Sequence, residues 1–400
     1  MIAVVLAALL TSVQTAAAQE PGASLRISVL TFGQGDLVFE RFGHNALRVH
    51  DTATGQDLAY NWGMFSFDEP NFLGRFLSGD TRYWVEAFPT AWLVDSYARQ
   101  DRETIEQDLA LTPAQRAELA AFVAHNALPE NRYYRYDYFR DNCSTRLRDA
   151  LDLALGGALE RRFAPVNTPW TYRSESVRLT APDGLAQAGI DIALGPRADI
   201  PITAWESMFI PMRMRDFLRE VTIPAADGGT MPLVSAERVL YDATRAPELT
   251  ARRGLTIGAW GPIIGAWMLL LVPFSAAATR RRTRIPAAVM AGLWYGITGI
   301  LGVALLGMWV GSAHVFWYNN WNLLLLSPLG LVIAVPAARS VLRGHAPRWV
   351  RACVGVVLGM ALLTLLLWPF VRQELGGPLL VLLPGHLGLA IALWLHTRAA

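Results

Sequence analysis

The distribution of apolar residues divides the chain into two unlike parts. From about residue 254 onward, apolar side chains run in long, nearly unbroken stretches separated by short polar loops. Stretches of about 20 apolar residues are long enough to cross a bilayer as helices. Before residue 254 the apolar runs are short and interrupted by polar residues, which is typical of a water-soluble domain. The predicted membrane-spanning segments lie at about 255–275, 286–310, 321–338, 352–370 and 379–395.

The part before residue 254 has the patterns of both strands and helices. The alternation that begins at His44 predicts a strand, and the turn residues at 51–56 predict a hairpin to a further strand. Thr112 and Pro113 are helix-start residues and predict a helix. The fold class is therefore α+β, followed by an all-α bundle of about five helices. Among the expected elements are strands at 25–32, 44–50 and 57–67, and helices at 92–100 and 112–126.

The distribution of arginines indicates how the chain is oriented in the membrane, and the low net charge does not indicate a nucleic-acid partner. The net charge is only +2, and all 35 basic residues are arginine. Arginines cluster in two loops of the apolar part, at 280–284 and 339–351, whereas the other two loops contain only Arg372. Because loops rich in arginine stay in the cytoplasm, the part before residue 254 is expected outside the membrane and the C-terminus inside.

The first residues have the pattern of an export signal. An apolar run from Ile2 to Leu10 is followed by small residues that end before Gln19. We therefore expect residues 1–19 to be a signal peptide or an N-terminal anchor. The exported domain is expected at residues 20–253, and the polytopic transmembrane domain at residues 254–400.

The candidate nucleophile is Cys143, the one cysteine outside the apolar part. Asp141 and Asn142 are good helix N-cap residues, and apolar residues follow Cys143 at helical spacing. In the first turn of a helix, free N–H groups and the helix dipole favour a thiolate, so we expect a lowered thiol pKa. A single exported cysteine cannot form an internal disulfide. The alternative is that Cys143 is an inert core residue.

The candidate base is His44, which shares a strand face with Ala46 and Arg48. A strand histidine that precedes a helix-start cysteine is the papain-type pair in circularly permuted order, and such sites are defined by geometry rather than by chain order. Asn61, on the strand paired with that of His44, is a candidate to orient the imidazole. Asn61 could instead only satisfy backbone near Gly63, and His50 is the other candidate for the orienting role.

Further residues are expected to contact the substrate, and no metal or cofactor is expected. The tyrosine-rich segment before Cys143 would line the approach to the sulfur, although such residues are common in plain cores. His314, Asn320 and Asn322 fall at the outer membrane interface, where they would contact lipid head groups; the alternative is a plain interfacial belt. The expected oxyanion and substrate contacts near the cysteine are Asn142, Ser144, Arg146 and Tyr138.

Four segments of the sequence resemble one family. They are Phe42–Val49, Tyr60–Gly63, Asp141–Asp149 and Trp321–Leu324 with Pro328. Together they resemble the Lnb family of bacterial lipoprotein N-acyltransferases, which have an exported N-terminal domain. The cysteine segment also resembles permuted NlpC/P60-like and lecithin:retinol acyltransferase-like enzymes. The resemblance implies a circularly permuted papain-like (NlpC/P60-like) periplasmic domain ahead of the membrane bundle.

The resemblance also implies an activity and a place in the cell. It implies an inner-membrane acyltransferase that moves an acyl chain from a membrane phospholipid, through a thioester on Cys143, to the α-amine of a diacylglyceryl-cysteine lipoprotein. The catalytic residues implied are Cys143 and His44. Two alternatives remain: an NlpC/P60-type periplasmic peptidase or amidase acting on the cell wall, and a non-catalytic membrane binding module.

Overall fold

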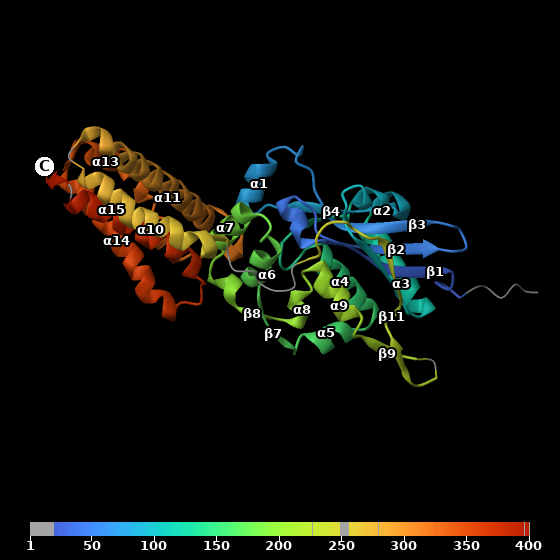
Figure 1. Cartoon of the computed structure of the whole chain (residues 1–400). Coiled ribbons are helices and arrows are strands. Elements are labelled where there is room, and N and C mark those ends of the chain that lie inside the picture. The colour runs from blue at the N-terminus through green and yellow to red at the C-terminus, as the bar shows by residue number, and fades with distance from the viewer. Residues whose placement is uncertain (1–19, 226, 249–255, 279, 396, 400) are drawn as a thin grey trace, which may run out of the picture.

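A computed structural model describes residues 20–225, 227–248, 256–278, 280–395 and 397–399. The expected signal peptide or anchor at 1–19 lies outside the described residues. The molecule consists of two parts that lie one after the other, a sheet-rich part and a helix bundle (Figure 1). The α+β domain followed by five apolar helices that the sequence predicts is confirmed.

The sheet-rich part is built on an antiparallel sheet. Seven strands of the described chain form it in the order β11-β5-β1-β2-β3-β4-β6. The hairpin predicted at 51–56 joins β2 to β3, with Leu47 opposite Tyr60 and His50 opposite Asp57. The strands are β1 (Leu25–Phe32), β2 (His44–Asp51), β3 (Asp57–Met64), β4 (Arg82–Pro89), β5 (Thr104–Leu109), β6 (Tyr133–Arg135) and β11 (Val234–Tyr241).

Helices cover both faces of the sheet, because successive strand residues point to opposite sides. Leu47 of β2 lies in the core shared with α3 (Pro113–Asn126) and α4 (Cys143–Ala154). Its neighbour Ala46 packs on the opposite face against Leu93 of α2 (Thr90–Ala98). The predicted alternation of β2 is therefore confirmed, and both faces of the strand are buried.

The chain between α4 and β11 forms short elements. Some of their apolar side chains join the core that contains α4, and others form a further core that includes Tyr172 and Phe209 together with Phe316 of η4 (Val315–Trp317). In order, the elements are α5 (Ala158–Phe163), β7 (Asn167–Thr171), α6 (Tyr172–Leu179), α7 (Gly184–Ala193), η2 (Pro196–Asp199), β8 (Pro201–Thr203), α8 (Ala204–Ser207), α9 (Pro211–Leu218), β9 (Thr222–Pro224) and β10 (Thr230–Pro232).

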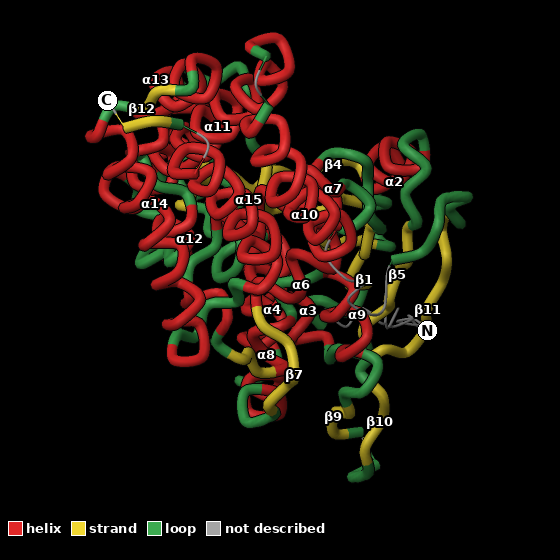
Figure 2. The backbone as a smooth tube through the Cα atoms, turned by 60° about the vertical axis from the view of Figure 1, so that its left-hand side comes forward, coloured by secondary structure: helices red, strands yellow, loops and turns green. Residues whose placement is uncertain are grey.

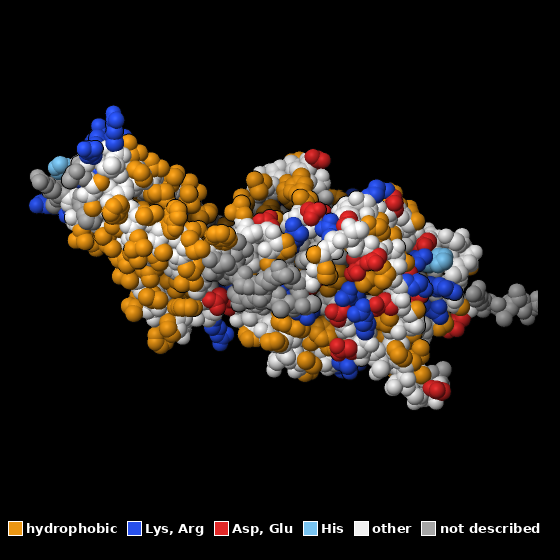
Figure 3. Space-filling view, viewed as in Figure 1, with side chains coloured by type: hydrophobic (Ala, Val, Ile, Leu, Met, Phe, Trp, Pro, Cys, Tyr) orange, Lys and Arg blue, Asp and Glu red, His pale blue; other side chains and the backbone are white. Residues whose placement is uncertain are grey.

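Five helices of the described chain are long and apolar enough to cross a membrane, as predicted. Figure 2 shows them side by side as one bundle, and Figure 3 shows a nearly continuous hydrophobic surface over them. The third predicted segment is two helices, α12 (Asn322–Leu325) and α13 (Leu329–Arg343), separated by a break just before Pro328. The others are α10 (Thr256–Ala277), α11 (Ile285–Gly311), α14 (Arg348–Leu367) and α15 (Gly376–Leu395).

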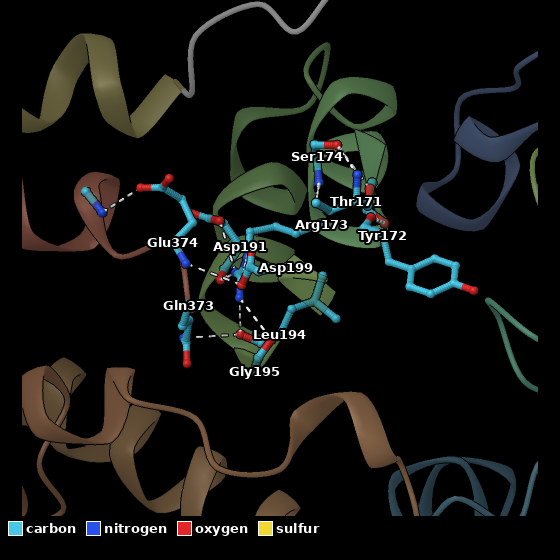
Figure 4. Close-up of polar contacts among 12 residues, drawn as sticks. Thr171, Tyr172, Arg173, Ser174, Asp191, Leu194, Gly195, Asp199, Gln373 and Glu374 are labelled. Atoms are coloured by element: carbon cyan, nitrogen blue, oxygen red, sulfur yellow. Dashed lines mark hydrogen bonds and ion pairs between the residues drawn. The ribbon is translucent and has the colours of Figure 1, made fainter. Parts of the chain in front are cut away.

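A buried ion network joins the bundle to the sheet-rich part (Figure 4). The Arg173 guanidinium, 1% exposed, donates to Asp199 at 2.8 Å and also bonds the buried Asp191. Asp199 in turn accepts a hydrogen bond from the backbone N–H of Glu374, in the loop between α14 and α15, at 3.3 Å. Gln373 of the same loop donates to the carbonyl of Leu194. The loop is therefore fixed against the domain that carries Cys143.

Candidate active site

Cys143 is the first residue of α4, as the sequence predicts. The side chain of Asn142 caps the helix: its Oδ1 accepts from the N–H groups of Ser144 and Thr145, both at 2.9 Å. Its amide nitrogen donates to the carbonyls of Tyr138 and Phe209 at 3.1 and 2.9 Å. The start of α4, and with it the sulfur, is held by four hydrogen bonds from one side chain.

The sulfur lies where β2 and β3 separate. Pairing between these strands ends at Leu47 and Tyr60, so the N–H of Asn45 lies beyond the last pair. This N–H is near enough to the Cys143 sulfur to lower the pKa of the thiol. On the other strand, Gly63 has φ +90°, and a Cβ placed there would be 3.6 Å from the Cβ of Cys143. The gap between the strands thus allows the nucleophile to reach the strand that carries the histidine.

His44 is held by neighbours on β3 and α2. Its Nε2 is hydrogen-bonded to the Oδ1 of Asn61. Its ring lies nearly parallel to that of Tyr97, with centroids 6.0 Å apart and an interplanar angle of 9°. His50 lies at the other end of β2, opposite Arg26 and Asp57. Of the two candidates for orienting the imidazole, Asn61 is the one placed to do so.

Two residues near the site were not singled out from the sequence. Arg102, 4% exposed, lies 4.5 Å above the Tyr97 ring and donates to the carbonyl of Gly33 at 2.9 Å. Its positive charge lowers the pKa of both His44 and Cys143, although less than burial shifts either one. Tyr97 follows Leu93 at helical spacing, which could have placed it on the sheet side of α2. Nothing in its local pattern distinguishes Arg102 from the other arginines.

Burial has the largest effect on the protonation states of Cys143 and His44. It raises the pKa of the Cys143 thiol to about 11, although the backbone N–H groups of Asn45 and Ser144 oppose the shift. Burial also lowers the pKa of His44 to about 4, against the hydrogen bond to Asn61. The expected lowering of the thiol pKa by the helix end is therefore wrong for this state, because desolvation of the thiolate outweighs the helix-end donors. At neutral pH the pair is a thiol and a neutral imidazole.

Alkylation of Cys143 by iodoacetamide should therefore be slow at pH 7. A thiol pKa of about 11, against an ordinary value of about 8.5, leaves roughly 300-fold less thiolate. We expect the rate in the folded Cys353→Ser protein to rise up to about pH 11, and in the unfolded chain to level off near pH 9. Mass spectrometry of time points gives both profiles. A folded protein that reaches its maximal rate below pH 8 would contradict the buried resting thiol.

Gly63→Ala should reduce both stability and access to the sulfur. Because Gly63 has a positive φ, a side chain there is strained by about 1–2 kcal/mol. The new methyl group would also lie against Cys143. Gly156→Ala is the matched control, since Gly156 also has positive φ but has no atom within 4 Å of an added Cβ. Both variants should lower the free energy of unfolding, and Gly63→Ala alone should slow alkylation of Cys143 further.

The side chains beside the cysteine that were predicted to contact the substrate interact with other protein groups. The Ser144 hydroxyl is fully buried and donates to the carbonyl of Met208 at 2.6 Å, so it does not face a substrate. Asn142 is used as the helix cap described above. Arg146 pairs with Asp141 at 2.7 Å and lies over the Tyr134 ring. The ring of Tyr138 is directed toward His314, at 5.5 Å between centroids.

The predicted head-group contacts of His314, Asn320 and Asn322 are wrong for this structure. All three are buried, at 8, 1 and 0% exposure. His314 Nε2 is 2.7 Å from the carbonyl of Phe76. Asn320 and Asn322 both donate to the carbonyl of Ile192, at 2.8 and 3.0 Å. These bonds attach the segment between α11 and α13 to the sheet-rich part. Because buried polar groups take protein partners, these side chains are not available to lipid head groups.

Comparisons with known families agree with this architecture. A family model described as the Lnb N-terminal periplasmic domain matches residues 13–176, which include His44, Asn61 and Cys143. A second, described as the Lnb transmembrane domain, matches residues 255–398. Searches of curated proteins and of solved structures find no match. Among the described residues, no group of three His, Cys, Asp or Glu side chains is placed to hold a metal ion.

The two family matches show that the chain belongs to the Lnb family and is a multi-pass inner-membrane protein with a periplasmic domain and five membrane helices.

Proposed function

We propose that the protein is a lipoprotein N-acyltransferase with Cys143 as nucleophile, His44 as general base and Asn61 as the residue that positions His44. The observation that carries the proposal is the gap between β2 and β3. There the backbone N–H of Asn45, the residue after His44, lowers the pKa of the Cys143 thiol, while Asn61 is hydrogen-bonded to the imidazole. Family membership supports the same reading. We further propose that this is a circularly permuted papain-like site within the domain expected at residues 20–253.

In the first step, His44 takes the thiol proton as the sulfur attacks an ester carbonyl of a phospholipid. Since Asn61 occupies Nε2, the nitrogen that takes this proton is Nδ1. Proton transfer accompanies attack, because both groups are neutral at rest. The C–O bond of the ester then breaks, and His44 returns the proton to the leaving lysophospholipid oxygen. The product is an acyl-thioester on Cys143.

In the second step, the free α-amine of a diacylglyceryl-cysteine lipoprotein attacks the thioester carbonyl. His44 takes a proton from the amine and gives it to the departing sulfur. An amide bond forms, the C–S bond breaks, and the thiol is regenerated. The backbone N–H groups of Asn45 and Cys143, which both lower the pKa of the thiol, are the candidate donors to the oxyanion in both steps.

The membrane part places this chemistry beside its substrates. Both the donor and the acceptor are lipids held in one leaflet, so confinement removes much of the entropic barrier to bringing them together. Positively charged side chains gather at the end of the bundle far from the sheet-rich part (Figure 3). By the positive-inside rule this end, with the C-terminus, is cytoplasmic. The region after residue 254 then acts as the anchor of the periplasmic site.

Asn61→Leu should slow acyl transfer by up to roughly 10²–10⁴-fold, because the imidazole loses the hydrogen bond that holds it. Asn61→Asp should retain more activity, since a carboxylate can accept the same bond. A carboxylate also raises the pKa of His44, so the acidic limb of the pH–rate profile should move to higher pH. A merely structural Asn61 would not produce that shift. The measurement is the pH profile of acyl transfer in the full-length protein.

The proposed reaction can be tested with full-length protein in phospholipid nanodiscs. A synthetic peptide with an N-terminal diacylglyceryl-cysteine is added, and its mass is followed. We expect the mass of one acyl chain to be gained, and lysophospholipid to accumulate in equal amount. A parallel digestion of purified cell wall should release no peptides. Release of cell-wall peptides without peptide acylation would overturn the proposal in favour of a peptidase.

A further inference from the structure

Six large apolar side chains form an exposed surface beside the bundle, here called the apolar ridge. Phe67 and Leu73 are its most exposed members, each at 66%. Figure 3 shows hydrophobic side chains gathered at the place of α1 (Phe72–Ser78) in Figure 1. An exposed apolar cluster of this kind marks an interaction surface. The ridge consists of Leu37, Val38 and Phe39 in and before η1 (Val38–Phe42), Phe67 in the loop after β3, and Leu73 and Leu77 of α1.

The ridge is attached to the outer end of a membrane helix. α11 ends at Gly311, and the N–H of Ala313 donates to the carbonyl of Ser78, at the end of α1, at 2.8 Å. Gly79 has φ +81°, and a Cβ there would be 3.0 Å from Ala313, so only glycine allows this approach. Val310, the residue before the last one of α11, is 80% exposed and belongs to the lipid-facing surface of the bundle. The ridge is therefore continuous with that surface.

The one charged residue of α1 is paired with carboxylates. Arg75 of α1 pairs with Glu69 at 2.8 Å and with Asp80 at 3.1 Å. The helix thus keeps its charges in mutual pairs while its apolar side chains are left uncovered. An amphipathic element of this type, at the level where a membrane helix ends, fits the boundary between head groups and acyl chains.

A row of aromatic side chains leads from the ridge to the sulfur. Its members, from the membrane side inward, are Phe76, Phe72, Phe65, Tyr83 and Tyr136, with neighbouring ring centroids 6.3, 5.7, 5.0 and 4.3 Å apart. Phe67 of the ridge lies 5.0 Å from Phe72 and 5.1 Å from Phe65. At the inner end, Tyr136 is 3.7 Å from the position of a Cβ on Gly63, the residue that faces Cys143.

We propose that the apolar ridge inserts into the outer leaflet of the bilayer, and that a lipid acyl chain lies along the aromatic row with its ester end at Cys143. The continuity of the ridge with the lipid-facing side of α11 identifies lipid as the occupant. The insertion stands independently of the reaction, whereas the role of the row rests on the proposed acyl transfer. The row then acts as the specificity-determining surface for the chain, and its apolar character keeps water from the thioester.

The insertion is tested by replacing Phe67 or Leu73 with the photo-crosslinking residue p-benzoylphenylalanine. Trp92, an aromatic residue of α2 that is 52% exposed, is the matched control. Each full-length variant is placed in phosphatidylcholine nanodiscs, irradiated and analysed by mass spectrometry. We expect phospholipid adducts at positions 67 and 73 and none at position 92. Protein–protein crosslinks in place of lipid adducts would overturn the insertion in favour of a second copy, and no adduct at either position would overturn it as well.

The same crosslinking in a Cys143→Ala background separates insertion from catalysis. Lipid adducts should persist there, even though no acyl transfer is expected. The role of the row is tested by Phe72→Ser, compared with Trp92→Ser, using a long-chain and a short-chain phospholipid donor. We expect Phe72→Ser to lower the rate at least 10-fold with the long chain and less than 2-fold with the short one. An equal loss with both donors would overturn the row as the binding surface for the chain.

Discussion

Cys143→Ser and His44→Ala are each expected to abolish N-acylation, with losses of at least roughly 10⁴-fold. The hydroxyl of serine is a far weaker nucleophile than the sulfur when only a neutral imidazole is available as base. Without His44, no group takes the proton from a thiol whose pKa is raised to about 11. The measurement is mass spectrometry of lipoprotein N-termini in a strain that depends on this gene.

The chain supplies a matched control for each of these variants. Cys353→Ser removes the other cysteine, which lies in α14 within the membrane part. His50→Ala removes a histidine from the same strand as His44, at its opposite end. Both controls should leave the lipoproteins triacylated. Triacylated products in the Cys143 or His44 variant, at unchanged protein level, would refute the assigned roles.

Arg173→Leu is expected to lower the free energy of unfolding by about 3–5 kcal/mol, more than the strain expected for Gly63→Ala. Arg173 and Asp191 are 1% and 0% exposed in their side chains, and Asp199 is 9% exposed. Removing the cation takes a buried charge partner away from two buried carboxylates. It also removes the donor to the carbonyl of Leu194 at 2.6 Å. Denaturation of the full-length protein in detergent measures the loss.

The control for Arg173 is an exposed ion pair of the same chemical type. Arg99 pairs with Asp95 one helical turn away, and both side chains are about 60% exposed. Such surface pairs contribute about 0–1 kcal/mol, so Arg99→Leu should hardly change the unfolding curve. An Arg173→Leu protein as stable as the Arg99→Leu protein would show that the network at the joint is not structurally important.

Features that depend on neighbouring residues could be predicted from the sequence. The start of α4 follows from the capping chemistry of Asn142, and the start of α3 from Thr112 and Pro113, because both signals act within four residues. The five membrane helices follow from the length of their apolar stretches. Pairing of β2 with β3 follows from the hairpin between them, and it brings Asn61 to His44.

Features that depend on distant segments could not be predicted. The partner of His314 is Phe76, 238 positions earlier, and that of Asn320 is Ile192, 128 positions earlier. No local pattern distinguishes an asparagine at a lipid surface from one at a buried joint. The predicted lowering of the thiol pKa is wrong for the same reason. The helix end acts locally and favours the thiolate, but burial depends on the whole fold and has the larger effect.

The most direct measurement is the mass of the intact protein after incubation with a phospholipid of one defined acyl chain and no acceptor. The account predicts an increase equal to the mass of the fatty acid minus one water. The added mass should be located on Cys143, be removed by neutral hydroxylamine, and disappear when a diacylglyceryl-cysteine peptide is added. An unmodified Cys143 in a protein that still acylates the peptide would contradict the thioester and, with it, the central claim.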